Sequence, residues 1–392
     1  MTDSRMVAML AVLCAANFVV TASGSATAPF LPMIASDLST SVAAIAHLFS
    51  AQAVTWGAAA LVAGTLSDRF GRRSILVAGV VLLGATRLGF ATSQSYAAVL
   101  GWQLVSGLGG GAFMGTVFAT VSDHVPSGMR GRALSWVITG QSLSLVLGVP
   151  LIALLGAVGG WRGAIAAHGV AVIVTAVAVR LATPADLPHH AHAAKTKTPL
   201  ALFAKPKLIA LLAAGTTERL CFASLAIYLP TYLHDAYGVS LGGLALALAL
   251  VALGNLVGNL LGGRIADRTR SRPQVFAVAS ALTAVLAVPT LMWEPGLAIS
   301  VALGFAYSFV NSAGRPSLMA TLAEMPSEIR GALFGLNITT NSIGWLLAGS
   351  AGGWLIATGG FVALGAFCAG AAVLGSALAL ASGPAKSPPT PL

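Results

Sequence analysis

The sequence predicts an all-α membrane protein with twelve transmembrane helices in two pseudo-symmetric six-helix halves. Three observations support this fold class. Of the 392 residues, 57% are hydrophobic and only 8% are charged, whereas a soluble domain carries about 25% charged residues. Uncharged runs longer than the roughly 20 residues that cross a bilayer recur along the chain. Short motifs also repeat at offsets of 199 and 200 residues.

The first half, residues 1–182, holds six predicted helices. The uncharged run 6–36 follows a short charged start, as in a signal peptide, but it is too long for the apolar region of one. We therefore interpret it as an uncleaved first helix. The other five predicted helices are residues 38–67, 75–91, 97–121, 133–158 and 163–179.

A change of composition separates the halves. Residues 183–206 are rich in proline, histidine and lysine, which indicates a polar cytoplasmic linker. The second half, residues 207–383, is followed by a proline-rich tail, residues 384–392, that we expect to be unstructured. Residues 331–385 contain no charge and are too long for one span, and two consecutive glycines divide them into the last two helices. The other four predicted helices are residues 208–233, 241–263, 275–293 and 297–322.

The basic residues predict the orientation of the chain. Seventeen of the 21 Lys and Arg residues fall on one side of a twelve-span topology, and the other side holds only Arg162. Positive charge marks the cytoplasmic side of membrane proteins, so both termini are predicted to be cytoplasmic. The net charge of +10 therefore reports orientation and not a nucleic-acid surface. The three cysteines lie in apolar runs and are predicted to be reduced packing residues.

Two motif pairs show that the halves repeat. Gly64-x-Leu-Ser-Asp68-Arg69 matches Gly263-x-Ile-Ala-Asp267-Arg268 at an offset of 199 residues. A Pro-x-x-x-Arg-Gly motif beginning at residue 126 recurs at residue 326, an offset of 200. Internal duplication of this kind is typical of transporters.

The segment between the second and third predicted helices resembles the signature motif of the major facilitator superfamily. The residues that carry this resemblance are Gly64, Leu66, Asp68, Arg69, Gly71, Arg72 and Arg73. Residues Asp267 and Arg268 resemble a degenerate second copy. In helix 133–158, residues Gly140, Gly148 and Pro150 resemble the antiporter motif of the drug:proton branch, although Leu151 and Ile152 replace its last glycines.

This resemblance implies a gating role for the motif. It implies that Asp68 meets the start of the eleventh helix near Gly331, and that Arg72 or Arg73 reaches Asp123, so that the contacts latch the halves on the cytoplasmic side. Gly71 would allow the tight turn, and Gly64 would let its helix approach a neighbour closely. The alternative is that the charges only set the topology.

Four charged residues fall well inside the predicted spans: Arg87, Glu218, Arg219 and Arg315. Each costs about 2.5 kcal/mol or more to insert at a helix centre, so each is a functional candidate. Glu218 lies about 15 Å into its helix, near the bilayer centre. Either Glu218 carries a proton and Arg219, turned about 100° from it, tunes it, or the two belong to an inert interhelical network.

A polar residue also stands where the family commonly carries an arginine in the fourth helix. That place is taken by Gln103 in this sequence. Arg87 is predicted to lie at a similar depth, so it is a candidate to supply the missing charge of the proton relay. Structural pairing of Arg87 is the alternative.

Equivalent positions of helices 97–121 and 297–322 differ in character. Gly107, Gly111 and Gly115 form a smooth face on the first helix, whereas the second offers a polar stripe at helical spacing. If these faces line the central cavity, substrate contacts lie in the second half. Simple interhelical hydrogen bonding is the alternative. The candidate cavity residues are Tyr307, Asn311, Arg315, Asn337, Asn341, Gln141 and Tyr228.

These observations predict a secondary transporter and not an enzyme. We expect a monomer in a bacterial-type cytoplasmic (inner) membrane, with a small-molecule substrate, protons as coupling ion, the lipid bilayer as partner, and no cofactor, metal or nucleic acid. The first hypothesis is proton-coupled efflux of small apolar or drug-like compounds. The second is a permease for an organic anion or metabolite, which the three intramembrane arginines favour. The third is a non-transporting membrane sensor.

Overall fold

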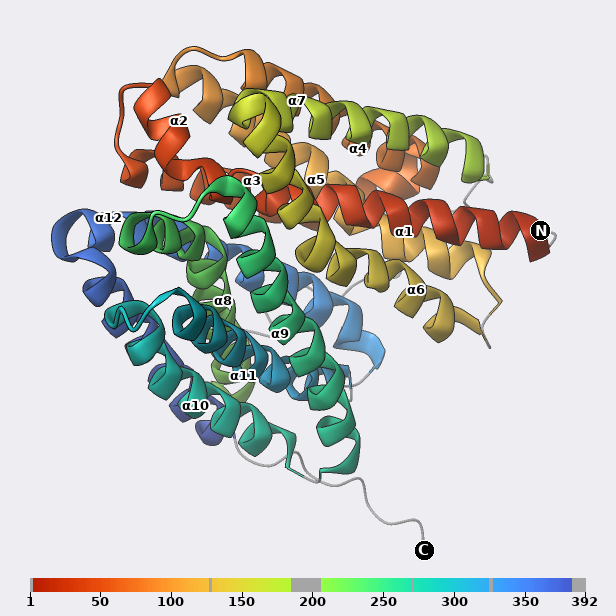
Figure 1. The fold of residues 1–392 in the computed structure, drawn as a ribbon. Coiled ribbons are helices and arrows are strands. Elements are labelled where there is room, and N and C mark those ends of the chain that lie inside the picture. The colour runs from red at the N-terminus through yellow and green to blue at the C-terminus, as the bar shows by residue number, and fades with distance from the viewer. Residues whose placement is uncertain (1–2, 127–128, 185–205, 270, 324–326, 383–392) are drawn as a thin grey trace, which may run out of the picture. The chain divides into compact units, whose positions relative to one another are not determined.

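The computed structural model describes residues 3–126, 129–184, 206–269, 271–323 and 327–382. Every regular element in these ranges is helical (Figure 1). The first elements are α1 (Asp3–Ser25), η1 (Ala28–Phe30), α2 (Leu31–Asp37), α3 (Val42–Phe70), α4 (Arg72–Thr92), α5 (Tyr96–His124), α6 (Arg130–Leu143), the π-helical segment η3 (Ser144–Gly148) and α7 (Val149–Ala182). They are followed by α8 (Pro206–Tyr237), α9 (Leu241–Arg268), α10 (Arg272–Met292), α11 (Leu297–Ala323) and α12 (Ser327–Ala381).

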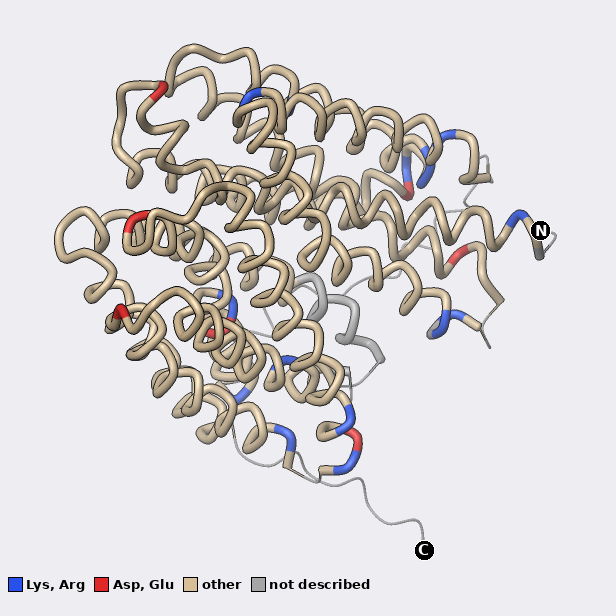
Figure 2. The backbone as a smooth tube through the Cα atoms, viewed as in Figure 1, with Lys and Arg blue, Asp and Glu red and all other residues tan. Residues whose placement is uncertain are grey.

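Ten helices of the described chain are long and apolar enough to cross a membrane. Their positions agree with the uncharged runs of the sequence. Most of the linker 183–206 and the tail 384–392 lie outside the described residues. Most charged positions lie near helix ends, and the long tan stretches between them are uncharged (Figure 2).

Two of the long helices are broken at a glycine. Gly160 in α7 has φ 65° and ψ 176°, and Gly360 in α12 has φ 65° and ψ −164°. A positive φ is accessible to glycine without a steric penalty, so each helix can change direction there. The boundary predicted between residues 158 and 163, and the division predicted at Gly359 and Gly360, are confirmed as helix breaks.

The predicted single helix 6–36 is divided in the structure. Helix α1 ends at Ser25, and η1 and α2 follow as short separate elements. Pro29 and Pro32 lie in the first turns of η1 and α2, where a missing backbone N–H leaves no helical hydrogen bond unmade. Continuing α1 through these prolines would have removed such bonds, which explains the break.

The described residues form two compact units. Unit 1 takes Met1–Ala193, Ala226–Ala249 and Gly349–Gly353, and unit 2 takes Ala194–Leu225, Leu250–Ala348 and Trp354–Leu392. Helices α8, α9 and α12 contribute to both units. In unit 1, α5 packs on α3 and α4, while α7 packs on α4 and α1. In unit 2, α10 packs on α11.

A row of glycines fixes the contact between α5 and α3. A Cβ atom at Gly107 would lie 2.4 Å from the Gln52 carbonyl oxygen, and one at Gly111 would lie 2.3 Å from that of Trp56. This glycine face, considered above as a possible cavity wall, is therefore packed against the backbone of α3. Small residues permit such close approach of membrane helices.

Unit 2 has a matching contact with the roles of the helices exchanged. Here the glycines Gly254, Gly258 and Gly262 belong to α9, and α11 supplies the opposing backbone. A Cβ atom at Gly258 would lie 2.2 Å from the Phe309 carbonyl oxygen. The polar stripe of α11 consequently points elsewhere, toward the site described next.

Candidate functional site

The turn between α3 and α4 is built around Gly71. Its φ of 93° lies in a region that L side chains rarely adopt, so a glycine is required at this turn. The turn places Arg72 at the first position of α4, beside the last residues of α3. The tight turn predicted at Gly71 is therefore confirmed.

Arg72 joins three helix ends. Its Nε donates to Asp123 Oδ2 at 3.0 Å, at the end of α5, and its Nη2 contacts Asp68 Oδ1 at 2.5 Å. Its Nη1 donates to Ser67 Oγ at 2.5 Å and to the Gly64 carbonyl at 3.4 Å. The resemblance implied that Arg72 or Arg73 reaches Asp123. Arg72 makes this contact, which lies within unit 1, and the implied latch between the halves stays a prediction. A planar guanidinium can hold several acceptors in this way.

The other residues of the motif have separate contacts. Arg73 donates to the carbonyl of Arg180 at the end of α7, and the Arg69 guanidinium lies 5.3 Å from the ring centre of Phe70. Among the described residues no atom lies within 4 Å of a Cβ built at Gly64, so the close approach predicted there is not seen. The partner expected for Asp68 near Gly331 involves side chains outside the described residues.

The second copy of the motif ends α9. Asp267 and Arg268 are exposed there, while Arg272 Nε donates to the carbonyl of Ala266 at 3.1 Å. Arg272 stands 200 residues after Arg72 and, like it, binds a carbonyl near the end of the preceding helix. The sequence did not identify this counterpart of Arg72, because the motif's offset of 199 residues aligns Arg72 with Ser271.

A buried charge cluster lies in unit 2. Glu218 of α8 is 3% exposed, and Arg219 bonds both of its carboxylate oxygens, with Nε 2.7 Å from Oε2. Arg315 of α11 donates from Nη1 to Oε2 at 3.1 Å. The three groups carry one negative and two positive charges, which leaves one positive charge in excess. Glu218 and Arg219 meet because the long Arg219 side chain folds back toward its neighbour.

The polar stripe of α11 lies against α8 around this cluster. The Tyr307 hydroxyl donates to the Cys221 carbonyl at 3.2 Å, and Asn311 Nδ2 donates to the Glu218 carbonyl at 3.5 Å. Tyr307 is fully buried and Asn311 nearly so. The three residues of the polar stripe, Tyr307, Asn311 and Arg315, thus contact α8 near Glu218. The sequence alone did not predict this grouping.

A second polar network lies in unit 1. Arg87 of α4 is fully buried, and its Nη2 donates to the Ser23 carbonyl at 2.8 Å and to Ser106 Oγ at 3.1 Å. Gln52 Nε2 also donates to Ser106 Oγ, at 3.0 Å, and Gln103 Nε2 donates to Gln52 Oε1 at 3.2 Å. Arg87 and Gln103 therefore belong to one network through two intermediate residues. The sequence did not identify Ser23 and Ser106 as members of this network.

The remaining candidates are dispersed. The Tyr228 hydroxyl donates to the Gly349 carbonyl at 3.1 Å within unit 1, and Gln141 is half-buried in α6. Asn337 Nδ2 contacts Met319 Sδ at 3.8 Å, and Asn341 is half-buried with an oxygen that has no hydrogen-bond partner among the described residues. In the ranges that the structure covers, no group of three His, Cys, Asp or Glu residues could hold a metal ion.

Comparisons with known proteins agree with this architecture. The sequence model of the Major Facilitator Superfamily matches residues 13–288 and 211–392. The chain is 30% identical over 339 residues to a chloramphenicol resistance protein of Streptomyces lividans, with 81% of this chain and 84% of that protein covered. It is 26% identical over 351 residues to the inner membrane transport protein YdhP of Escherichia coli (strain K12), with 88% of each covered.

The fold is also similar to that of a solved structure. A bacterial homologue of the human lysosomal transporter Spinster, crystallised in an inward-facing and occupied conformation, matches with a TM-score of 0.79 at 15% identity, over 95% of this chain and 96% of that one. At this identity the likeness concerns the fold alone. Together with the family match, the all-helical architecture and the signature turn, it establishes that the chain belongs to the Major Facilitator Superfamily and is a multi-pass membrane transporter of small molecules, not an enzyme.

Proposed function

We propose that the protein is a proton-coupled secondary transporter that exports small apolar or drug-like compounds by alternating access. The name of the Streptomyces lividans relative, a chloramphenicol resistance protein, supports efflux as the direction of transport. The single structural observation on which the proposal depends is the buried Glu218 between two arginines. A carboxyl group held inside a membrane span is a candidate proton site.

Protonation of Glu218 would change the contact between α8 and α11. When the carboxylate is charged, it links Arg219 and Arg315. When it is neutral, two like charges face each other without a counter-charge, and their repulsion favours separation of the helices at this point. The hydrogen bonds of Tyr307 and Asn311 to α8 do not involve the carboxylate, so they would serve as the pivot. Proton binding would in this way be coupled to helix movement.

Gating is assigned to the signature turn. Asp68, Arg72 and Asp123 would hold the ends of α3, α4 and α5 together. The two ion pairs of Arg72, with Asp68 and with Asp123, would reorganise when the cytoplasmic side opens. Asp68 is half exposed, and exposed pairs contribute only about 0–1 kcal/mol each. Such weak contacts suit a latch that reopens in every transport cycle.

The proposed topology has twelve crossings in two halves, residues 1–182 and 207–383, joined by the linker 183–206. Helix α12 has 55 residues, about 80 Å at 1.5 Å per residue, whereas a bilayer core is about 30 Å thick. A helix of that length crosses twice if it turns at Gly360, and the continuous segment from α6 to α7 crosses twice if it turns at Gly160. Ten long helices then give twelve spans in a monomer of the inner membrane, with both termini cytoplasmic.

An organic-anion permease is the second candidate. The excess positive charge beside Glu218 favours it, and so does Arg87, whose described hydrogen bonds go only to neutral oxygens. The two candidates differ in the charge of the substrate, so a binding screen separates them.

The screen measures thermal unfolding of the purified chain in detergent with chloramphenicol, lipophilic cations, sugars and organic carboxylates. Efflux of apolar compounds predicts a concentration-dependent rise in Tm with chloramphenicol or other apolar drugs, because a ligand that binds only the folded state stabilises it. A rise confined to carboxylates, and lost in Arg315→Gln or Arg87→Gln, would replace the first candidate by the second.

A further inference from the structure

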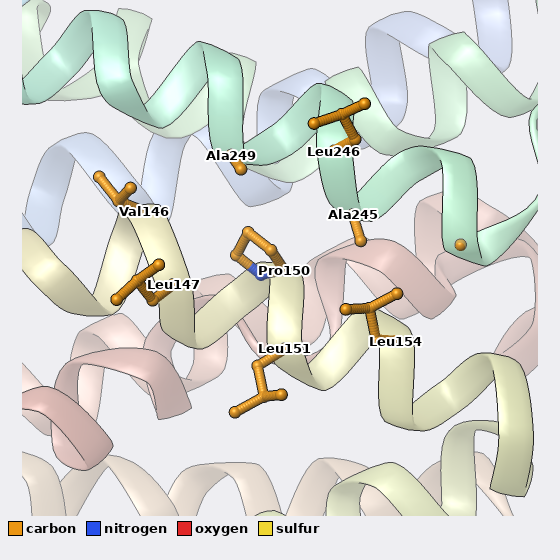
Figure 3. Close-up of a pocket in the computed structure, with 9 residues that line it drawn as sticks. Val146, Leu147, Pro150, Leu151, Leu154, Ala245, Leu246 and Ala249 are labelled. Atoms are coloured by element: carbon orange, nitrogen blue, oxygen red, sulfur yellow. The ribbon is translucent and has the colours of Figure 1, made fainter.

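An apolar groove runs between η3 and α7 on one side and the first turns of α9 on the other (Figure 3). Its volume is about 490 Å³. The residues that line the groove all belong to unit 1. Pro150 points into the gap between the two helices (Figure 3). The lining consists of Val146, Leu147, Pro150, Leu151, Leu154, Gly242, Ala245, Leu246 and Ala249.

The lining contains no polar side chain. Its outer rim is exposed, since Leu147 is 55% and Leu246 is 67% exposed, while Ala245 is buried at its floor. All five residues of one wall belong to or follow the π-helical segment Ser144–Gly148, where the extra residue per turn alters the packing of a helix. The groove is therefore an aliphatic hollow on the surface between two membrane-spanning helices.

The chemistry of the groove selects its occupant. A water molecule needs two to four polar partners, and nothing in the lining offers a side-chain partner. An unfilled gap would forfeit the dispersion contacts of its walls. The leucines that line the groove, among them Leu147, Leu151 and Leu246, are exposed, so an acyl chain of the surrounding bilayer can reach them. An unbranched hydrocarbon chain supplies contacts without requiring any hydrogen bond.

We propose that this groove is a binding site for a phospholipid acyl chain. The site goes beyond the proposed transport function and does not depend on it. Because its two walls come from residues before the linker and after it, a bound chain bridges the two sequence halves. Lipid bound there would stabilise whichever conformation keeps the walls at this separation, since a ligand shifts an equilibrium toward the state that it binds better.

The test uses full-length protein in proteoliposomes of phosphatidylcholine that carries a diazirine in one acyl chain. After illumination, mass spectrometry compares lipid attachment at Leu147 and Leu246 with attachment at Val174 and Val177. The latter pair is 62% and 56% exposed and lies outside the groove. We expect about fivefold more attachment in the groove, equivalent to about 1 kcal/mol of preference.

Groove-filling variants make the test specific. Ala249→Phe should reduce attachment at Leu147 to the level at Val174, and the milder Ala245→Leu should do so in part. The control Leu261→Phe, at an exposed position about 18 Å further along the same helix, should have no effect. Equal attachment at groove and reference positions, or attachment unchanged by both fillings, would overturn the proposal. None of these outcomes depends on transport activity.

Discussion

Two residues, Arg72 and Glu218, each pair with two side chains of opposite charge. The side chain of Arg72 is 14% exposed and donates hydrogen bonds to acceptors on α3 and α5. A lysine, with its single ammonium group, could not bind all of these acceptors in the same geometry. Glu218 has the same position in its cluster with the signs reversed, since one carboxylate serves two arginines. In both places one planar group joins different helices: consecutive helices at Arg72, and α8 with α11 at Glu218. Replacing either residue would remove an ion-pair contact from each of two oppositely charged neighbours.

The two glycines of the signature turn should respond differently to alanine. Gly71→Ala forces a Cβ into a backbone with φ 93° and should lower the free energy of unfolding by about 1–3 kcal/mol. Gly64→Ala is the matched control, since no described atom lies within 4 Å of the added Cβ and alanine favours helix. Thermal unfolding in detergent measures both. A loss of stability at Gly64 equal to that at Gly71 would contradict this account.

Residue identities were easier to predict than residue partners. The pair of Arg72 with Asp123 followed from a motif, and Glu218 followed from a lone carboxylate in an apolar run. Its contact with Arg315 did not follow, because the two residues are 97 positions apart and no local pattern states that α8 lies beside α11. For the same reason the sequence did not predict that Ser106 links Arg87 to Gln52. Both side chains donate to its hydroxyl oxygen, but nothing in the sequence distinguishes Ser106 from other small polar residues.

Among the elements, glycine faces decide which helices touch. In unit 1 the glycines of α5 receive the backbone of α3, and in unit 2 the glycines of α9 receive the backbone of α11. Only the row on α5 was identified from the sequence, as a smooth face, and the row on α9 was missed. The spacing alone left open whether such a row is a packing face or a cavity wall, since either role favours small residues. The contact atoms of the neighbouring helix settle the question.

Adding one methyl group to a glycine face should weaken the fold. Gly111→Ala places a Cβ 2.3 Å from the Trp56 carbonyl, so the helices must separate, at a cost of about 1–3 kcal/mol. Gly258→Ala in unit 2 should behave alike. The control is Gly101→Ala on α5, where no described atom lies within 4 Å. Chemical or thermal unfolding compares the three variants, and equal stability of Gly111→Ala and Gly101→Ala would exclude the packing role.

At the scale of the whole molecule, the duplicated sequence organises the chain. The family could be predicted from the signature motif. The helix positions, with the boundary near Gly160, could be predicted from hydropathy, because membrane spans need long uncharged runs. The break at Gly360 could be predicted from two consecutive glycines. The short elements after α1 were not, since prolines in an apolar run are also compatible with a kinked helix. Among the described residues the repeats differ inside the spans: the buried cluster of the second repeat joins a carboxylate to two arginines, whereas the described hydrogen bonds of Arg87 in the first repeat go to neutral oxygens.

Accessibility labelling should establish the number of crossings. In a variant without native cysteines, the single cysteines Gly159→Cys and Thr358→Cys, placed beside the two helix breaks, should react with a membrane-impermeant maleimide in intact cells. Arg132→Cys and Arg264→Cys should react only after the membrane is permeabilised, because positive charge marks the cytoplasmic side. If the two sites beside the breaks required permeabilisation, the twelve-span topology would be wrong.

Gradient-driven transport by Glu218→Gln tests the central claim most directly. Wild-type protein and variant are reconstituted in proteoliposomes, a proton gradient is imposed, and accumulation of a compound that raises Tm in the binding screen is followed. The matched control is Glu294→Gln, which removes an exposed carboxylate between α10 and α11. The account predicts that Glu218→Gln still binds the compound but no longer accumulates it in response to the gradient, while the control transports like wild type. Undiminished gradient-driven accumulation by Glu218→Gln would contradict the account.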